Sequence, residues 1–445
     1  MNFYALSTPP GISGIAVIRL SGTNALQIAN QISRTIIAKP RTALLKKFYD
    51  LNGNVIDEGI IIWYPEGNSY TGDHVVEMHT HGSKAVVQKL MSDLDQRSDC
   101  RLAEPGEFTK TALKNNKINL FEAESIADLL HAETEAQRVQ ALRLKNSSPK
   151  FVIWREVILE VLSKIEASID FNEEDLPYDI LKNLNLKIKN ILNEIDIMLD
   201  DSTGEIIRDG YKIAIIGPPN SGKSSFLNML VKRQAAIVSS IKGTTRDIIE
   251  VKYQINNYPV ILTDTAGIRR TKNKIEKTGV ALALSASKES NLDIVILDGT
   301  QSQIPNDIKS LIGNKTLVII NKKDKRNYNA KKFIKLLKFI KTKAIIEISI
   351  KNNDGIDKLQ KKLKKIVSGI DTVQSTTLIS RARHRALLKK CSKCLNDYLN
   401  NDVKKNPEIA AADLQLASNN LGHIVGFIGV EEILGKIFKD FCIGK

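Results

Sequence analysis

The chain has 445 residues, of which 42% are hydrophobic and 26% charged, a composition typical of a folded protein with several domains. No apolar run reaches the roughly 18 residues that a membrane-spanning helix needs, and four cysteines are too few for a disulfide framework, so a cytoplasmic protein without a membrane span is expected. Lys and Arg outnumber Asp and Glu by 65 to 50, and the formal charge of +15 suits RNA as a partner as well as it suits a lysine-rich, solvated surface.

Residues 1–118 alternate short β-like runs with turn signals, which predicts a mixed α+β domain. Asn52-Gly53 lies between two apolar runs and is a strong hairpin signal, and a helix is expected after Gly82. Glu77, His79 and His81 alternate along one predicted strand, so their side chains would share a face. Ordinary half-buried histidines are the favoured interpretation there, and a metal site is the weaker one.

From residue 119 the hydrophobic pattern becomes helical and stays so to 208, with a break at 176–179. Two apolar stripes are predicted, each on one helix face: Ile126, Leu129, Ala136, Val139 and Leu142, then Leu184, Ile188, Ile191, Ile195 and Leu199. Strands and helices alternate over 209–367, the pattern of a doubly wound sheet. Residues 368–445 are helical again, so an α/β domain is expected to interrupt a helical region.

A phosphate-binding loop is indicated by residues 217–224, GPPNSGKS, which match G-x-x-x-x-G-K-S. The motif follows the strand-like run KIAII and precedes a helix, the context in which backbone amides and a helix N-terminus bind phosphates. Lys223 would bridge the β- and γ-phosphates during catalysis, and Ser224 would bind Mg²⁺. The loop residues expected at the nucleotide are Asn220, Ser221, Gly222, Lys223, Ser224 and Ser225.

Three further motifs follow in the order that a GTPase requires: GTTRD at 243–247, DTAG at 264–267 and NKKD at 321–324. Thr245 would bind Mg²⁺ and serve in catalysis, and Asp264 would stand behind the metal. Asp324 can accept two hydrogen bonds from the guanine edge, so the nucleotide should be GTP. The other residues expected at the nucleotide are Thr265, Ala266, Gly267, Asn321 and Lys322, with Ser349 closing the base pocket.

The residue after DTAG is Ile268, where Ras-type enzymes place the glutamine that orients the attacking water. An isoleucine cannot orient water, so hydrolysis needs help from another group. A degenerate fold that binds without hydrolysing is the alternative, and it is disfavoured because the polar groups of the motifs are intact.

The chain resembles the MnmE (TrmE) family of tRNA-modification GTPases in GPPNSGKSSFLN, GTTRD, DTAGIR, the N-terminal TPPG and AVIRLSG, INLFEAESIADLL and the terminal CIGK. The resemblance covers essentially the whole chain. It implies an α+β folate-binding-type domain that also forms a homodimer (1–118), a discontinuous α-helical domain (119–208 and 368–445) and an inserted Ras-like P-loop GTPase domain (209–367).

The resemblance also implies a potassium-dependent GTPase that works with the flavoprotein MnmG, which carries the FAD. Together such proteins install a carboxymethylaminomethyl group at C5 of the wobble uridine of certain tRNAs. A K⁺ ion would replace an arginine finger, held by Asn220, Ser239, Ile241 and Thr244, of which Ser239 and Thr244 also belong to the nucleotide site. Glu276 would organise the attacking water as a catalytic residue, although without the family a helix-surface acid is the favoured interpretation.

A tetrahydrofolate derivative, 5,10-methylene or 5-formyl, is the implied one-carbon cofactor. The family positions that contact it match Arg19, Glu77, Lys117 and Lys445, each of which taken alone is an ordinary surface charge. A pterin offers a pair of donors to a carboxylate, and its glutamate tail offers anions to Arg and Lys. Thr80 and Ser83 stand where the family often has cysteine and glycine, so the details of the pocket are left open.

Cys442, in the terminal CIGK, is the last candidate catalytic residue. Glycine and lysine after the first aliphatic residue match a prenylation signal poorly. A frayed end is the plain alternative, whereas in MnmE proteins this tail lies near the folate site. The choice between a nucleophile, a proton-transfer group and a positioning element stays open.

The sequence leaves a second functional class: an Era-like ribosome-assembly or RNA-binding GTPase switch without modification chemistry. Such a protein shares the GTPase motifs, but its function gives no reason for the N-terminal domain or the tail. A third alternative, a pure folate-binding scaffold, is contradicted by the intact phosphate-binding residues. For the basic stretch 322–343 a solvated helix face is favoured over a tRNA contact, and for Cys391 and Cys394 a buried helix face is favoured over zinc.

Overall fold

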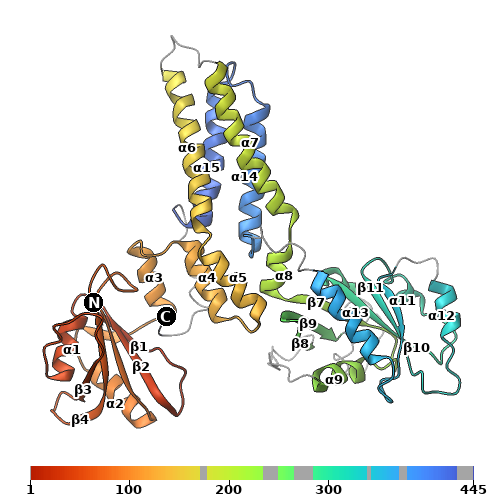
Figure 1. Cartoon of the computed structure of the whole chain (residues 1–445), viewed down its shortest axis with the longest axis horizontal. Coiled ribbons are helices and arrows are strands. Elements are labelled where there is room, and N and C mark those ends of the chain that lie inside the picture. The colour runs from red at the N-terminus through yellow and green to blue at the C-terminus, as the bar shows by residue number, and fades with distance from the viewer. Residues whose placement is uncertain are drawn as a thin grey trace, which may run out of the picture. The chain divides into compact units, whose positions relative to one another are not determined.

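The computed structural model describes residues 2–170, 178–233, 249–264, 284–337, 342–369, 378–427 and Gly444. The chain divides into two compact units (Figure 1). The first comprises Met1–Leu130, Arg143–Leu192 and Leu387–Lys445, and the second comprises His131–Leu142 and Asn193–Ala386. Within the described residues, no helix is both long and apolar enough to cross a membrane.

The first unit begins with a six-stranded sheet in the order β3-β4-β5-β2-β1-β6. Its strands are β1 (Asn2–Leu6), β2 (Ser13–Ser21), β3 (Leu44–Tyr49), β4 (Val55–Tyr64), β5 (Val75–Gly82) and β6 (Cys100–Leu102). Neighbours pair antiparallel except β1 with β6. Helices α1 (Ala25–Ser33) and α2 (Lys84–Asp95) pack against one face of this sheet, where Ile18, Leu20, Val76 and Met78 are buried.

The hairpin and the helix predicted in this unit are both confirmed. Strands β3 and β4 flank Asn52-Gly53, and Gly53 has a φ of +88°, a conformation that favours glycine. Helix α2 starts directly after Ser83, whose side chain accepts a hydrogen bond from the Val86 amide as an N-cap.

The helical part of the first unit contains α3 (Glu107–Lys114), α4 (Leu120–Leu130), the end of α5 (Glu135–Lys145), α6 (Ser148–Asp170), most of α7 (Tyr178–Asp200), most of α14 (Ala382–Asn400) and α15 (Pro407–Val425). Figure 1 shows α6, α7, α14 and α15 side by side as a bundle. The predicted stripe of α7 is confirmed, because Leu184, Ile188, Ile191 and Ile195 are buried.

The other predicted stripe, from Ile126 to Leu142, is wrong. The chain leaves α4 at Leu130 and starts α5 at Glu135, so the stripe falls on two helices, and Val139 and Leu142 are 40% and 38% exposed. A local cap explains the break: the Thr134 hydroxyl accepts from the Gln137 amide, and the Gln137 side chain accepts from the Thr134 amide.

The second unit holds a six-stranded sheet in the order β12-β11-β10-β7-β9-β8. Its strands are β7 (Tyr211–Ile216), β8 (Ile249–Ile255), β9 (Tyr258–Asp264), β10 (Leu292–Asp298), β11 (Thr316–Asn321) and β12 (Ala344–Glu347), and only β8 is antiparallel to its neighbour. Its helices include α8 (Thr203–Asp209), α9 (Lys223–Arg233), α11 (Asn306–Lys309), α12 (Ala330–Leu337) and α13 (Ile356–Ser368).

This sheet is covered on both faces, as expected for a doubly wound fold. Side chains of α9 and α13 share one apolar core, which includes Phe226 and Leu359, and side chains of α11 and α12 share another, which includes Ile308 and Phe333. Residues 131–142, expected in the helical region, belong to this second unit. The lysines of α12 are exposed, as both a solvated helix face and a tRNA contact would require.

Candidate functional site

The phosphate-binding loop connects β7 to α9 at the carboxyl edge of the second sheet, the place where ligands bind doubly wound folds. Gly222 has a φ of +106°, and a Cβ there would come within 2.4 Å of Asn321 Nδ2. Asn220 also has a left-handed backbone, with a φ of +59°. The tight loop that the motif predicts is therefore formed, and its second glycine is required by space as well as by conformation.

Lys223 is 8% exposed, and its ammonium donates to the Gly217 and Pro218 carbonyls, at 2.7 Å each. These bonds hold the cation inside the curve of the loop, where it would meet phosphate oxygens. Ser221 Oγ is buried without a hydrogen-bond partner in the described residues. Ser224 is exposed in the first turn of α9, so its hydroxyl is accessible to a metal ion at the phosphates.

The residues predicted to recognise the base follow β11 and β12. Asn321, at the end of β11, donates from Nδ2 to the Ser221 carbonyl at 2.9 Å and accepts from the Ile350 amide at 3.2 Å. It therefore ties the phosphate-binding loop to the base-side loop. Ser349 Oγ donates to Asp324 Oδ1 at 2.7 Å, and this hydrogen bond holds the pKa of the Asp324 carboxyl below its ordinary value.

Lys322 has a φ of +69° and its ammonium donates to Asp298 Oδ2 at 2.6 Å, at the end of β10. The pair anchors the motif to the end of β10. The Asp298 carboxyl has a lowered pKa: its burial raises the pKa, and the hydrogen bonds from Lys322 and Thr300 outweigh that effect.

These loops enclose a cavity of about 640 Å³, which has room for a nucleotide. Asn220, Gly222, Lys223, Ser224, Ser225, Asn321, Lys322 and Asp324 line it, and Ser349 reaches it through Asp324. The structure thus brings together the predicted residues of two motifs that lie about a hundred positions apart. Asp264 ends β9 next to β7, as expected, and its side chain is outside the description.

Several predicted residues fall outside the described residues: Ser239, Ile241, Thr244, Thr245, Thr265, Ala266, Gly267, Glu276, Cys442 and Lys445. Two of the remaining folate candidates, Arg19 and Glu77, face each other on β2 and β5. Arg19 donates to Glu77 Oε1 from Nε at 3.0 Å and from Nη2 at 2.7 Å, and the two side chains are only 18% and 16% exposed. A half-buried charged pair is a typical recognition element.

Gly444 joins this pair from the far end of the chain. Its carbonyl accepts from Arg19 Nη1 at 3.3 Å and from Ser7 Oγ at 3.1 Å. It has a φ of +106°, and a Cβ on it would come within 2.6 Å of the Leu6 carbonyl, so only glycine fits. Lys117 donates to the Gly67 carbonyl at 2.5 Å, in the loop between β4 and β5. The structure therefore joins Arg19, Glu77 and Gly444, whereas Lys117, which follows α3, contacts the loop that precedes β5.

The predicted alternatives on other residues are also tested. His81 is 72% exposed and is held by Asp57, whose carboxylate accepts from the His81 ring and amide at 2.8 Å each. Among the described residues no cluster of His, Cys, Asp or Glu side chains forms a metal site. Cys391 is buried on α14, as predicted, and burial raises the pKa of its thiol.

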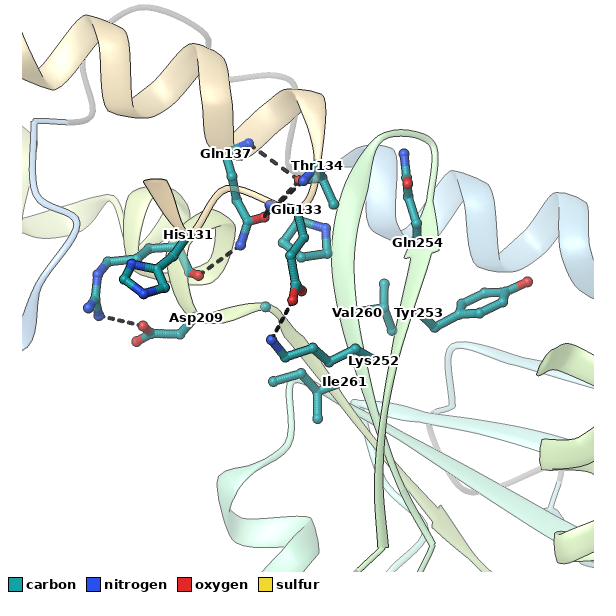
Figure 2. A pocket seen from close by; sticks show the side chains of 13 residues that line it. His131, Glu133, Thr134, Gln137, Asp209, Lys252, Tyr253, Gln254, Val260 and Ile261 are labelled. Carbon is teal, nitrogen blue, oxygen red and sulfur yellow. Dashed lines mark hydrogen bonds and ion pairs between the residues drawn. The ribbon is translucent and has the colours of Figure 1, made fainter. Parts of the chain in front are cut away.

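A second cavity, of about 170 Å³, was not predicted; it lies where residues 131–137 and the end of α8 meet the β8–β9 hairpin (Figure 2). Glu133 points toward Lys252 on β8, and their charged groups are 2.8 Å apart. The Ala136 amide donates to the Asn257 carbonyl at the hairpin turn, and Gln137 donates to the Arg208 carbonyl, at 3.3 and 3.1 Å. No local signal predicts these contacts, because their partners are more than 70 residues apart.

Comparison with known proteins shows which protein family the chain matches. Residues 120–442 match the family described as MnmE helical domain, and residues 2–117 match the one described as GTP-binding protein TrmE N-terminus. The chain is 47% identical to the tRNA modification GTPase MnmE of Pelagibacter ubique, with 100% of both chains covered. Proteins of the same name from Rickettsia prowazekii and Parvibaculum lavamentivorans are 42% and 40% identical, again over the whole of both chains.

Proposed function

The chain belongs to the MnmE family of tRNA modification GTPases and is a GTP hydrolase of that class, and from this premise we propose its reaction and partners. It acts with the flavoprotein MnmG, which holds the FAD, to install the carboxymethylaminomethyl group at C5 of the wobble uridine of certain tRNAs. The one-carbon unit comes from a 5,10-methylene or 5-formyl tetrahydrofolate. The protein works in the cytoplasm as a homodimer that forms through residues 1–118.

One observation carries the nucleotide part of the proposal: the phosphate loop and the base-side loop line one cavity and are joined by Asn321. Asp324 accepts the two guanine N–H donors, and Lys223 neutralises charge on the β- and γ-phosphates. Ser224 and Thr245 would hold Mg²⁺, which supplies electrostatic stabilisation at those oxygens. The exposed Ser224 hydroxyl at the start of α9 fits a hard cation that prefers oxygen ligands.

Ile268 is not able to orient water, so we assign that task to other groups. Asn220, whose left-handed backbone places it on the cavity wall, would hold a K⁺ ion together with Ser239, Ile241 and Thr244. Such a cation neutralises charge that develops between the phosphates, and Glu276 would organise the attacking water. Hydrolysis measured in KCl and in NaCl at equal ionic strength tests this role. Equal rates in the two salts would remove K⁺ from the mechanism.

The folate site is proposed at Arg19, Glu77, Lys117 and Lys445, with Cys442 as a further residue of the one-carbon chemistry. The half-buried Arg19–Glu77 pair and the docking of Gly444 on Arg19 support it, because they bring the tail to a carboxylate. A carboxylate accepts from the pterin donor pair, and the cations suit the glutamate tail. Turnover at the GTPase domain would drive movements that reorganise this centre.

Mass spectrometry of wobble uridines from cells that lack the gene tests the function. Wobble uridines without the C5 group, restored by the intact gene and not by a Lys223→Ala variant, are the expected result. Fully modified uridines in those cells would instead favour the Era-like switch in ribosome assembly, for which a defect in ribosomal subunits would then be sought.

A further inference from the structure

His79 lies one row along the first sheet from the Arg19–Glu77 pair. Within β5 it is two residues after Glu77, so both side chains project from the same face. Glu77 is paired with Arg19 and Ile62 on the neighbouring strands, and His79 is paired with Val17 and Ile60. The imidazole therefore stands between apolar side chains, next to a carboxyl group that Arg19 orients.

The contacts of Glu77 are divided between its two oxygens. Oε1 accepts both N–H groups of Arg19, whereas Oε2 is 3.6 Å from His79 Nε2, beyond hydrogen-bond distance. His79 Nε2 is buried and has no hydrogen-bond partner among the described residues. A buried ring nitrogen without a hydrogen-bond partner is unfavourable, because nothing offsets the loss of its contact with water. A ligand that forms a hydrogen bond with this nitrogen would remove that cost.

Tyr64 lies on β4, the strand next to the one that holds Glu77, and burial together with the nearby Glu77 carboxyl raises the pKa of its phenol. Arg19 orients the Glu77 carboxyl by two hydrogen bonds to one of its oxygens. His79 adds a potential N–H donor immediately beside it.

We infer that His79 is a specificity-determining residue of this site. Its Nε2–H donates a hydrogen bond to the C4 carbonyl of a pterin ring, next to the ring N–H whose hydrogen bond Glu77 accepts. The inference rests on the folate site proposed above and deepens it. The pyrimidine edge of a reduced pterin presents an amino group, a ring N–H and a C4 carbonyl in a row. A carboxylate complements the two donors, and a neighbouring donor complements the carbonyl. The site therefore selects 4-oxo pterins over 4-amino pterins.

The test compares tetrahydrofolate with 4-amino-4-deoxytetrahydrofolate, which replaces the C4 carbonyl by an amino group. The dissociation constants of both are measured for the intact protein and for His79→Leu, and their ratio is the readout. The intact protein is expected to prefer the 4-oxo compound, and His79→Leu to lower that preference about tenfold, the usual effect of losing one hydrogen bond in a partly buried site.

His81→Leu is the matched control, because His81 lies two residues further on the same face but is exposed and held by Asp57. It should leave the ratio unchanged. His79→Gln is the second variant: its amide can still donate and fits the space, so most of the preference should remain if the donor matters. Thermal melting of each variant confirms that the domain is folded.

The possible outcomes distinguish the role of His79 from the existence of the folate site. An unchanged ratio in His79→Leu, with tetrahydrofolate still bound, overturns the role of His79 and leaves the folate site standing. Failure of the intact protein to bind either compound overturns the folate site and this inference together. A drop in the ratio that His81→Leu reproduces would show a general effect of the strand and also refute the assignment.

Discussion

Asp324 and Ser349 lie on loops that follow two neighbouring strands. Their contact stabilises the charged form of the Asp324 carboxyl, the group predicted to bind the guanine base. Ser349 Oγ donates to the Asp324 carboxylate at 2.7 Å, which lowers the pKa of that group. An ionised carboxylate accepts two hydrogen bonds, from N1–H and the 2-amino group of guanine, and a protonated one cannot. We therefore expect base selectivity at this site to depend on these two side chains.

The first prediction changes the acceptor. Asp324→Asn replaces one acceptor oxygen by an amide donor, so the site loses a partner for guanine and gains one for the C2 carbonyl of xanthine. GTP affinity should fall by at least about 100-fold, while XTP affinity rises. Fluorescent-nucleotide titrations measure both. A parallel loss of both nucleotides would mean that Asp324 supports the loop and does not read the base.

The second prediction concerns pH. A carboxyl with a lowered pKa keeps its charged form as pH falls, and the binding that depends on the charge is lost only as pH falls through that pKa. Ser349→Ala removes the principal cause of the lowering, so the acid-side loss of GTP affinity should begin at higher pH. Titrations from pH 7 to 4 test this, with the exposed Ser310→Ala as control. Identical pH profiles for Ser349→Ala and the intact protein would contradict it.

At the scale of elements, the β8–β9 hairpin connects the two nucleotide-sensing motifs, since β8 begins two residues after GTTRD and β9 ends at the aspartate of DTAG. Its turn, Asn256-Asn257, has φ angles of +51° and +66°, which suit a tight hairpin. The Asn257 carbonyl and Lys252 hold residues 133–136 (Figure 2). The hairpin is thus attached to a segment that lies far from the GTPase motifs in sequence.

The third prediction addresses that attachment. Lys252 and Glu133 are 36% and 32% exposed, so their pair should contribute about 0.2–1 kcal/mol to the free energy of unfolding. A double-mutant cycle with Lys252→Met and Glu133→Gln should recover this coupling at low salt and lose most of it at high salt. Glu135→Gln, whose partner Arg138 lies on the same helix, is the control for a purely local pair. A coupling of zero at low salt would remove the pair from the attachment.

For the whole molecule, the two candidate sites lie in different compact units, and the chain end belongs to the unit that holds Arg19. The GTPase motifs therefore need no part of the tail to form their cavity. Arg19 and Gly444, in contrast, come from opposite ends of the chain and meet in the other unit. Local changes in one unit should therefore leave ligand binding in the other unit unchanged.

The fourth prediction uses Gly444. Gly444→Ala adds a Cβ within 2.6 Å of the Leu6 carbonyl at a φ that disfavours alanine, so the tail should leave Arg19. Tetrahydrofolate affinity should fall about tenfold or more, while GTP affinity stays unchanged. Gly14→Ala is the control, because no atom lies within 4 Å of its Cβ position. Unchanged tetrahydrofolate affinity in Gly444→Ala would separate the tail from the pterin site.

The sequence by itself determined the elements whose causes are local. The phosphate loop, the Asn52-Gly53 hairpin, the helix after Gly82 and the buried stripe of α7 each follow from residues close together in the chain, because turn conformations and periodicity act over a few residues. The base-side residues were predictable as well, since their motif follows a strand.

Only the tertiary structure decided which distant residues meet. Gly444 and Arg19 are 425 residues apart, Lys252 and Glu133 are 119 apart, and the partnerless nitrogen of His79 depends on the register of β5 against its neighbours. Such contacts arise from packing and strand pairing, which no short window of sequence encodes. The same reason explains the failed stripe from Ile126 to Leu142. Helix α4 ends at Leu130, a cap at Thr134 starts α5, and residues 131–142 belong to the second unit.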